Sequence, residues 1–374
     1  MSSCLILGGG INGLLCALLL RQSGLEVRVL ERGAVGRESS WAGAGILSLL
    51  PPWDYGMEVN ALAQRGRALW PEWAERLRVA SGIDPEYRAC GMVLLEVAQR
   101  DSALAWCMKH GEVALPLAEF PHPRPLSRWE RGDSAQGLWL PNVAQARNPR
   151  VMRALREAAL RVGVSIHEHT PATRLLTLGA RVSGVETPNG VFSADSVVVT
   201  AGAWTGGLLA EFGDAPAIAP VRGQIMLLKA APGLLPRIVY RRGHYLVPRA
   251  DGHILAGSTL EEVGFDKTTT TRARAELLDF AHSVMPALRQ AEIVTQWAGL
   301  RPGSPGNVPT IGRHPELENL YVNSGHFRYG VTMAPAAGEV LLSAMLGAPC
   351  PVDPAPYAWT GQENRLGGDA PQDS

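Results

Sequence analysis

The chain has 374 residues, 46% of them hydrophobic, so it is long enough to bury a large core and to form two domains. Its 35 basic residues balance its 35 acidic ones, so no summed field would attract nucleic acid or an anionic membrane, and a small partner is expected. The five cysteines are scattered without a Cys-x-x-Cys pair, which argues against a disulfide framework and a zinc site and favours a reducing cytoplasm. No bound metal is expected.

The first thirty residues predict a βαβ unit. Residues 4–7 form a strand, 8–10 a glycine turn, 12–23 a helix and 26–30 a second strand. The uncharged run over 3–20 approaches the length of a membrane span, but its central glycines and the lack of preceding basic residues favour a strand and a buried helix.

The middle of the chain mixes helices with short strands. An amphipathic helix is expected over 59–80, and residues 121–132, rich in proline and arginine, indicate an exposed insertion. Asn148 is expected to cap a helix over 150–162. Strands are predicted over 164–167, 174–177, 181–186 and 196–201.

The last part of the chain begins with a different sequence pattern. Extended runs between 221 and 257, separated by proline and Asp-Gly turns, predict an antiparallel sheet. Further along, the pattern predicts a helix at 270–284, an extended segment at 293–300, a buried strand at 320–323 and a helix at 332–346 that Gly347 ends. Residues 351–374 are expected to form a loose tail.

The glycine turn carries a dinucleotide-binding fingerprint. Gly8, Gly10 and Gly13 satisfy G-x-G-x-x-G between a strand and a helix. In this fingerprint they serve the tight turn, the approach of the backbone to a pyrophosphate and close helix packing, in that order. Glu31, 18 residues past Gly13, is placed to accept bonds from ribose hydroxyls. A glycine-rich turn of any α/β protein is the alternative, and the fingerprint does not separate FAD from NAD.

Two further segments favour FAD. Small residues over 38–45 would let a planar ring lie against the backbone. The helix expected at 332–346 would point its positive end at negative charge on a reduced flavin.

Four blocks of the chain resemble the D-amino-acid-oxidase superfamily of flavoproteins, and most closely its glycine-oxidising branch. They are GGGINGL with ERG, SSWAGAGIL, WAGLRPGSPGNVPTIGRHP, and GHFRYGVTMAPAAGE. The resemblance implies an α/β fold with a discontinuous Rossmann-like FAD-binding domain (1–84, 141–214 and 304–350). It also implies a mainly antiparallel α+β substrate domain over 85–140 and 215–303.

The resemblance further implies noncovalent FAD, since no cysteine lies near Arg301, where the sarcosine oxidase branch attaches its flavin. It assigns substrate carboxylate binding to Arg301 and Arg328 and substrate contact to Tyr245. The residues expected to bind the cofactor, from the fingerprint and the resemblance together, are Gly8, Gly10, Ile11, Asn12, Gly13, Glu31, Arg32, Ser39, Ser40, Ala42, Gly43, Ala44, Gly45, Ile46, Gly202, Arg328, Gly330, Val331 and Met333.

Arg301 also stands out on its own residues. It follows an apolar run and precedes Pro302, so its guanidinium is expected to emerge from buried surroundings and to need a carboxylate. That carboxylate is either a ligand's or a protein acid's, and the ligand is favoured. Tyr245, on a strand expected over 243–248, could donate a hydrogen bond to the same carboxylate, although a tyrosine on a strand is more often a packing residue.

The resemblance implies oxidation of glycine, sarcosine or small D-amino acids by molecular oxygen, with hydrogen peroxide as product, for thiazole synthesis in thiamine biosynthesis. It also implies a homo-oligomer. The alternatives are a D-amino-acid dehydrogenase with another acceptor, a non-catalytic FAD-binding subunit and a nicotinamide-dependent reductase. Gly243 stands where relatives have a histidine, with His244 next to Tyr245, and no role is assigned to His244, His314 or His326.

Overall fold

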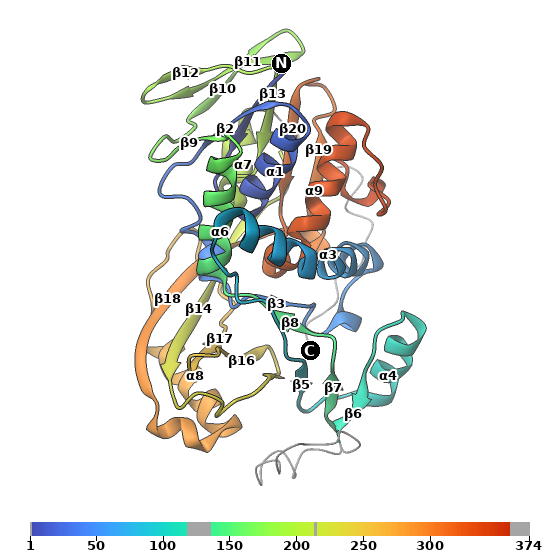
Figure 1. Ribbon diagram of the computed structural model, residues 1–374, viewed down its shortest axis with the longest axis vertical. Helices are drawn as coiled ribbons and strands as arrows, with labels where there is room; N and C mark the ends of the chain where they lie inside the picture. Colours follow the sequence, from blue (N-terminus) through green and yellow to red (C-terminus); the bar gives the residue numbers. More distant parts are fainter. Residues whose placement is uncertain (1, 118–135, 213–214, 360–374) are drawn as a thin grey trace.

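The computed structural model describes residues 2–117, 136–212 and 215–359, so the insertion predicted at 121–132 lies outside the described residues. The fold is α/β, as predicted, with two large sheets. In Figure 1 the six-stranded sheet and its helices occupy the upper half of the view, and most of the eight-stranded sheet lies in the lower half.

The six-stranded sheet has the order β19-β20-β13-β1-β2-β9. All neighbours are parallel except β19, which runs antiparallel to β20. The strands are β1 (Ser3–Leu7), β2 (Glu26–Leu30), β9 (Ser165–His167), β13 (Ser196–Val199), β19 (Thr310–Arg313) and β20 (Leu320–Ser324). From β1 the chain first adds β2 and β9 on one side of the sheet and later β13 and β20 on the other, so the carboxyl end of β1 lies at the switch point of the sheet, where α/β proteins bind ligands.

Four long helices pack together beside this sheet: α1 (Ile11–Gln22), α3 (Met57–Ser81), α6 (Asn148–Arg161) and α9 (Gly330–Leu346). The uncharged run at the N-terminus is divided by the glycine turn into β1 and α1, as predicted. Trp70 and Trp73 of α3 are both buried, and the Trp70 Nε1–H donates to the carbonyl of Val331 over 2.8 Å. This bond holds α3 against the first turn of α9.

The segment Phe327–Leu346 is long and apolar enough to cross a membrane, judged by length and composition alone, and 56% of its apolar window is buried inside the structure. The core helix of a water-soluble protein meets the same criterion. Gly347, in the left-handed conformation at φ 68°, ends α9 as the sequence predicted.

The eight-stranded sheet has the order β18-β14-β17-β16-β15-β5-β7-β6 and is antiparallel except for the β5–β15 pair. Its strands are β5 (Met92–Leu94), β6 (Leu115–Pro116), β7 (Leu138–Leu140), β14 (Ala219–Lys229), β15 (Ile238–Arg241), β16 (His244–Pro248), β17 (His253–Gly257) and β18 (Glu292–Gly303). Helix α8 (Thr271–Val284) contacts β14, β16 and β17, and Thr270 caps it through a bond from the Ala273 amide.

Shorter elements complete the described chain. Two three-stranded sheets consist of β10 (Arg174–Leu178), β11 (Arg181–Thr187) and β12 (Gly190–Phe192), and of β3 (Ile46–Leu47), β8 (Ala144–Gln145) and β4 (Arg88–Ala89). The short helices are α2 (Ser39–Ala42), α4 (Arg100–Lys109), α7 (Thr205–Leu209) and 3₁₀ turns that include η4 (Gly202–Trp204) and η8 (Phe327–Tyr329).

Two sequence predictions were wrong in detail. Asn148 does not cap α6: the helix starts at Asn148, whose Nδ2 instead donates to the carbonyl of Ser40 over 2.9 Å, because the side chain is buried under the 39–45 segment. The first part of the predicted loose tail is packed. Tyr357 and Trp359 are buried, and the Tyr357 hydroxyl donates to the carbonyl of Glu58 over 2.7 Å.

Candidate active site

A cavity of about 570 Å³ opens at the carboxyl end of β1 and extends to the β14–β18 edge of the larger sheet. Its volume is within the range of cofactor and ligand sites. Of the residues predicted to form the site, all line this cavity except Gly13 and Met333. The structure therefore brings together segments that are far apart in the chain.

The glycine turn at the end of β1 leaves no room for side chains. A Cβ on Gly8, whose φ is +121°, would lie 2.5 Å from the carbonyl oxygen of Thr200. A Cβ on Gly13 would lie 1.9 Å from the carbonyl oxygen of Gly8, so α1 packs directly on the turn. Gly13 thus lies behind the glycine turn and supports it without lining the cavity.

Glu31, at the end of β2, is held in place by backbone amides. Its Oε2 accepts from the Gly9 amide and its Oε1 from the Gly33 amide, each over 2.8 Å. Each oxygen keeps a further lone pair. The carboxylate lines the cavity, so it is fixed where a ribose hydroxyl could donate to it.

The first amide of α1 has a protein partner that the sequence did not indicate. Ser40 Oγ accepts from the Ile11 amide over 2.9 Å, so this amide already has a hydrogen-bond partner within the protein. The 42–46 segment is close to backbone on its other side, since a Cβ on Gly45 would lie 1.9 Å from the carbonyl oxygen of Ala146. This segment forms a wall of small residues along the cavity.

Arg32 and Met333 lie differently from the other predicted cofactor residues. The Arg32 guanidinium stacks on the ring of Trp204, 3.4 Å from its centroid, and forms an ion pair with Glu38 at 2.6 Å. Trp204 in turn stacks on Phe265. Met333 is fully buried in the core on α9 and has no place on the cavity wall.

Arg301, on β18, is a half-buried cation without an acidic partner among the described residues. Its Nη2 donates to Ser258 Oγ over 2.7 Å, and its Nη1 donates to the carbonyls of Thr259 over 3.1 Å and Arg222 over 3.3 Å. Burial lowers the pKa of Arg301 to about 10, so the guanidinium stays charged at neutral pH. Neutral oxygen atoms therefore orient the charge and leave it uncompensated.

Arg301 and Tyr245 both lie over glycines. A Cβ on Gly223 of β14 would come within 2.1 Å of Arg301 Nη2, and a Cβ on Gly257 of β17 would come within 2.7 Å of the Tyr245 ring. Tyr245 is buried on β16 and lies close enough to the Arg301 side chain to influence its pKa. Arg301 and Tyr245, both predicted to contact the substrate, are thus brought to the same cavity wall, and bare backbone lies beneath them.

The start of α9 contributes the remaining wall. Arg328, Gly330 and Val331 all line the cavity, and η8 leads directly into the first turn of the helix. Arg328 has a buried Nε without a hydrogen-bond partner among the described residues. Arg328 is thus a second cationic side chain, and it lies near enough to Arg301 to repel its positive charge and help lower its pKa.

His326 is buried at the cavity wall, with its Nδ1 3.2 Å from Asn12 Nδ2. Because the Asn12 amide nitrogen is a donor, Nδ1 serves as acceptor and the neutral ring carries its proton on Nε2. Burial lowers the pKa of His326 to about 3, so the ring is neutral. His326 Nε2 is buried without a partner among the described residues.

The other two unassigned histidines lie elsewhere. His244 is 2.9 Å from Glu276 of α8, and neither residue lines the cavity. His314 is buried beside Trp359, with ring centroids 4.6 Å apart.

The cavity wall fits FAD by its polar atoms as well as by its size. Buried polar atoms that have no partner among the described residues occur on five cavity-lining side chains, namely Asn12, Asn148, Asn323, His326 and Arg328. Such atoms are costly unless a ligand satisfies them. A cofactor that carries a pyrophosphate, hydroxyls and ring carbonyls supplies matching groups along the glycine turn and the start of α9.

Several wall residues were not predicted from the sequence. Ser258 and Gly223 position Arg301, while Trp204 and Phe265 form an aromatic part of the wall. The glycine in Val-Arg-Gly-Gln was a possible signal, since a glycine inside a strand often marks a close approach. No local sequence pattern indicated Ser258, Trp204 or Phe265.

The chain belongs to the DAO family, FAD dependent oxidoreductase, whose model matches residues 3–344. Its members use FAD, which agrees with the cavity described above.

Individual relatives are similar over almost the whole chain. Glycine oxidase of Pseudomonas putida is 41% identical, in a match that covers 97% of this chain and 98% of that protein. The bifunctional protein ThiO/ThiG of Synechocystis is 32% identical, covering 92% of this chain and 52% of that longer protein. The crystal structure of glycine oxidase from Geobacillus kaustophilus matches with a TM-score of 0.87 at 28% identity, covering 96% of this chain and 99% of that one.

Proposed function

We propose that this protein is an FAD-dependent oxidase of glycine, and of sarcosine or small D-amino acids, that uses molecular oxygen as acceptor. The observation that carries the proposal is Arg301, a half-buried cation on the cavity wall with no acidic partner among the described residues. The similarity to glycine oxidases over the full chain supports the choice of substrate.

In this proposal Arg301 binds the substrate carboxylate, with a hydrogen bond from Tyr245 and additional positive charge from Arg328. Pairing with a carboxylate would compensate the buried charge that the protein leaves open. Holding the carboxylate at one end fixes the α-carbon and amine at the other, so positioning supplies most of the rate enhancement that the protein itself provides.

FAD, when bound, supplies the two-electron oxidation chemistry. Overall, the amine is oxidised to an imine, water hydrolyses the imine to the oxo acid and ammonia, and oxygen is reduced to hydrogen peroxide. The residues that would hold the noncovalent cofactor are the glycine turn, Glu31, the 39–46 segment and the start of α9. The neutral His326 ring offers one further donor from Nε2.

We also propose the wider setting that the family resemblance suggests. The FAD-binding domain comprises 1–84, 141–214 and 304–350 and the substrate domain 85–140 and 215–303, which the sorting of strands between the two large sheets supports. The protein acts as a homo-oligomer in the cytoplasm, without a nucleic-acid or membrane partner. Its product serves thiazole synthesis in thiamine biosynthesis.

The test is to add glycine to the purified yellow protein without oxygen, follow the visible flavin band, and then admit air. Bleaching followed by rapid recovery and hydrogen peroxide is the expected result. Bleaching with slow recovery in air would replace the oxidase by a dehydrogenase with another acceptor. A band that no small amino acid bleaches would contradict the proposal and favour a non-catalytic FAD-binding subunit.

A further inference from the structure

The β14–β18 pair separates two groups of side chains on its two faces. Residues alternate along a strand, and the register pairs Val221 with Arg301 and Gly223 with Gly299. Gly223 and Arg301 therefore share the cavity face, while Arg222 and Gln224 point to the opposite face. Arg222 is 4% exposed and is not a cavity-lining residue, so its charge has no direct access to a substrate.

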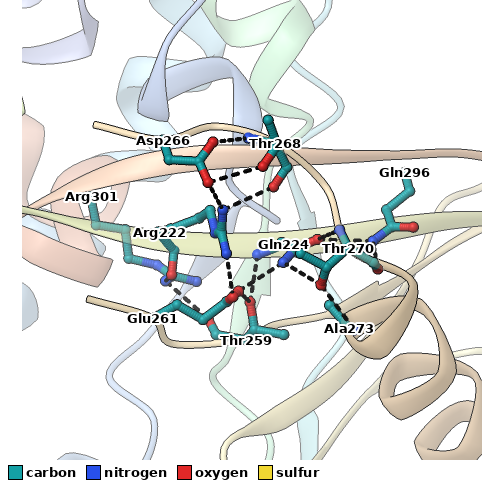
Figure 2. A network of polar contacts seen from close by, with 10 residues as sticks. All are labelled: Arg222, Gln224, Thr259, Glu261, Asp266, Thr268, Thr270, Ala273, Gln296 and Arg301. Atoms are coloured by element: carbon teal, nitrogen blue, oxygen red, sulfur yellow. Dashed lines mark hydrogen bonds and ion pairs between the residues drawn. The ribbon is translucent and has the colours of Figure 1, made fainter. Parts of the chain in front are cut away.

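On that opposite face, Arg222 ties the segment after β17 to β14 (Figure 2). Its guanidinium forms ion pairs with Glu261 at 2.6 Å and Asp266 at 2.7 Å and donates to the Thr268 carbonyl over 3.1 Å. Two backbone bonds between Arg222 and Glu261, of 2.9 and 3.0 Å, continue the sheet-like pairing along this segment.

We call the contacts of Arg222 with Glu261, Asp266 and Thr268 the Arg222 tie. Glu261 connects this tie to the residues that orient Arg301. Its Oε1 accepts from Thr259 Oγ1 over 2.6 Å and from Gln224 Nε2 over 2.8 Å. Thr259 Oγ1 also accepts from the Gln224 amide over 2.9 Å. Hydrogen bonds of the Thr259 side chain, together with the backbone bonds of Glu261, thereby hold the Thr259 backbone against β14.

Both carbonyls that accept from Arg301 Nη1 belong to residues that the Arg222 tie holds in place. One is the carbonyl of Thr259, and the other is the carbonyl of Arg222 itself, which also accepts from the Glu261 amide. A guanidinium has five N–H donors in a rigid plane, so fixing the two donors of Nη1 fixes the plane of the whole group. The direction of the donors that remain for a ligand is then set as well.

We propose that Arg222 and Glu261 are positioning residues for carboxylate binding: they clamp the Ser258–Glu261 segment on β14 and so hold the Arg301 guanidinium at the angle that receives the substrate. The inference rests on the proposed function of Arg301. It adds a pair of residues on the far face of the sheet to the determinants of substrate affinity.

The test compares the FAD-loaded wild-type protein with Glu261→Gln, which keeps the shape of the side chain and removes its charge. Acetate is the probe, because it has the carboxylate of glycine without the amine, and its binding is followed through the flavin absorbance. The dissociation constant of acetate is expected to rise about tenfold, which corresponds to about 1.4 kcal/mol. The KM for glycine should rise in parallel, whereas kcat changes less and FAD stays bound.

Glu339→Gln is the matched control. Glu339 also pairs with an arginine, Arg65, at 2.7 Å, and its side chain is 25% exposed, like that of Glu261. Neither Glu339 nor Arg65 lines the cavity. A general loss of stability after removing an ion pair should appear in both variants, and a loss of acetate affinity only in Glu261→Gln.

Equal acetate affinities in the two variants would overturn the inference and leave the proposed function intact. If Glu261→Gln does not fold, Arg222→Lys takes its place, since lysine keeps the charge but lacks the fork that reaches both acids, and an unchanged acetate affinity would again overturn the inference. A wild-type protein that binds FAD but no acetate would overturn the carboxylate site itself, and the inference with it.

Discussion

At the scale of single residues, the site depends on Arg301 and equally on its neighbours, which include a glycine beneath the guanidinium and, among the described residues, no acidic side chain. An arginine bound to neutral oxygens keeps its charge available, and a glycine beneath it lets the guanidinium lie flat on the strand. The absence of a side chain at position 223 is therefore a condition for substrate binding, although glycine itself has no functional group to offer.

Gly223→Ala should displace the Arg301 guanidinium, since the new Cβ would come within about 2.2 Å of three of its atoms. We expect acetate affinity to fall by about tenfold or more, as for a weakened buried charge pair, while FAD remains bound. Titration of the flavin absorbance with acetate measures this. Gly338→Ala on α9 is the control, because Gly338 does not line the cavity and a Cβ there meets only leucine methyl groups. Equal acetate affinity in both variants would show that the guanidinium can move aside without loss.

His326 provides a residue-scale prediction about pH. Its pKa is about 3 in the folded protein and about 6.5 in an unfolded chain, so between these values the unfolded state binds one more proton. The free energy of unfolding therefore decreases as the pH falls below 6.5, by about 2 kcal/mol from this residue between pH 7 and pH 5.

His326→Gln should remove that contribution. Urea unfolding of the FAD-loaded proteins at pH 7 and pH 5 should show a smaller acid-induced loss in the variant than in the wild type. His282→Gln, on α8, controls for the removal of a histidine elsewhere. Equal losses in wild type and His326→Gln would mean that the buried ring takes up its proton without cost.

At the scale of elements, the sequence predicted most helices and strands because their patterns are local. The βαβ unit, the α3 and α9 helices and the extended runs of the second sheet all appear where the pattern indicated them. The polar tie around Arg222 could not be predicted in this way. It depends on the register of β14 with β18 and on the path of the chain after Gly257, neither of which has a local signature.

The same limit applies to the site. Residues of the fingerprint and of the Arg301 block were found from their motifs, whereas Ser258, Phe265 and Gly223 reach the cavity only through tertiary packing. Asn148 shows the converse. Its sequence context indicated a helix cap, but burial under the 39–45 segment gave its amide a different partner.

Close packing of α9 against α3 and α1 leads to an element-scale prediction. A Cβ on Gly66 of α3 would lie 2.1 Å from the carbonyl oxygen of Thr332, whereas a Cβ on Gly338 of α9 would meet only leucine methyl groups at 2.6 and 2.7 Å. Backbone cannot move aside as a methyl group can. Gly66→Ala should therefore cost about 1–3 kcal/mol of stability, and Gly338→Ala about 1 kcal/mol or less, because alanine also favours the helix.

Gly66→Ala should in addition weaken FAD binding, since Thr332 follows directly on the cavity residue Val331. Chemical unfolding measures the first effect, and titration of the FAD-free variants with FAD measures the second. Similar stability and FAD affinity in the two variants would show that α3 and α9 can separate slightly without disturbing the cavity.

At the scale of the whole molecule, the cavity connects the two large sheets. Its wall includes Gly8 after β1, Gly223 on β14 and Gly330 at the start of α9. The Trp297 Nε1–H on β18 donates to the carbonyl of Ala42 on α2 over 2.9 Å, and Lys267 pairs with Glu38 at 2.9 Å, so protein contacts also join the segment after β2 to β18 and to the segment after β17. A ligand that fills the cavity contacts both sides at once.

FAD should therefore stabilise both sheets together. A ligand that binds only the folded state adds about 4 kcal/mol at a free concentration of a thousand times its Kd, so removal of FAD should lower Tm and added FAD should restore it in a concentration-dependent way. Calorimetry of the FAD-free protein at increasing FAD should show a single transition that moves to higher temperature. Two transitions, of which FAD moves only one, would contradict this. They would mean that the cofactor is held by the six-stranded sheet and its helices alone, and that the sheet carrying Arg301 unfolds independently of it.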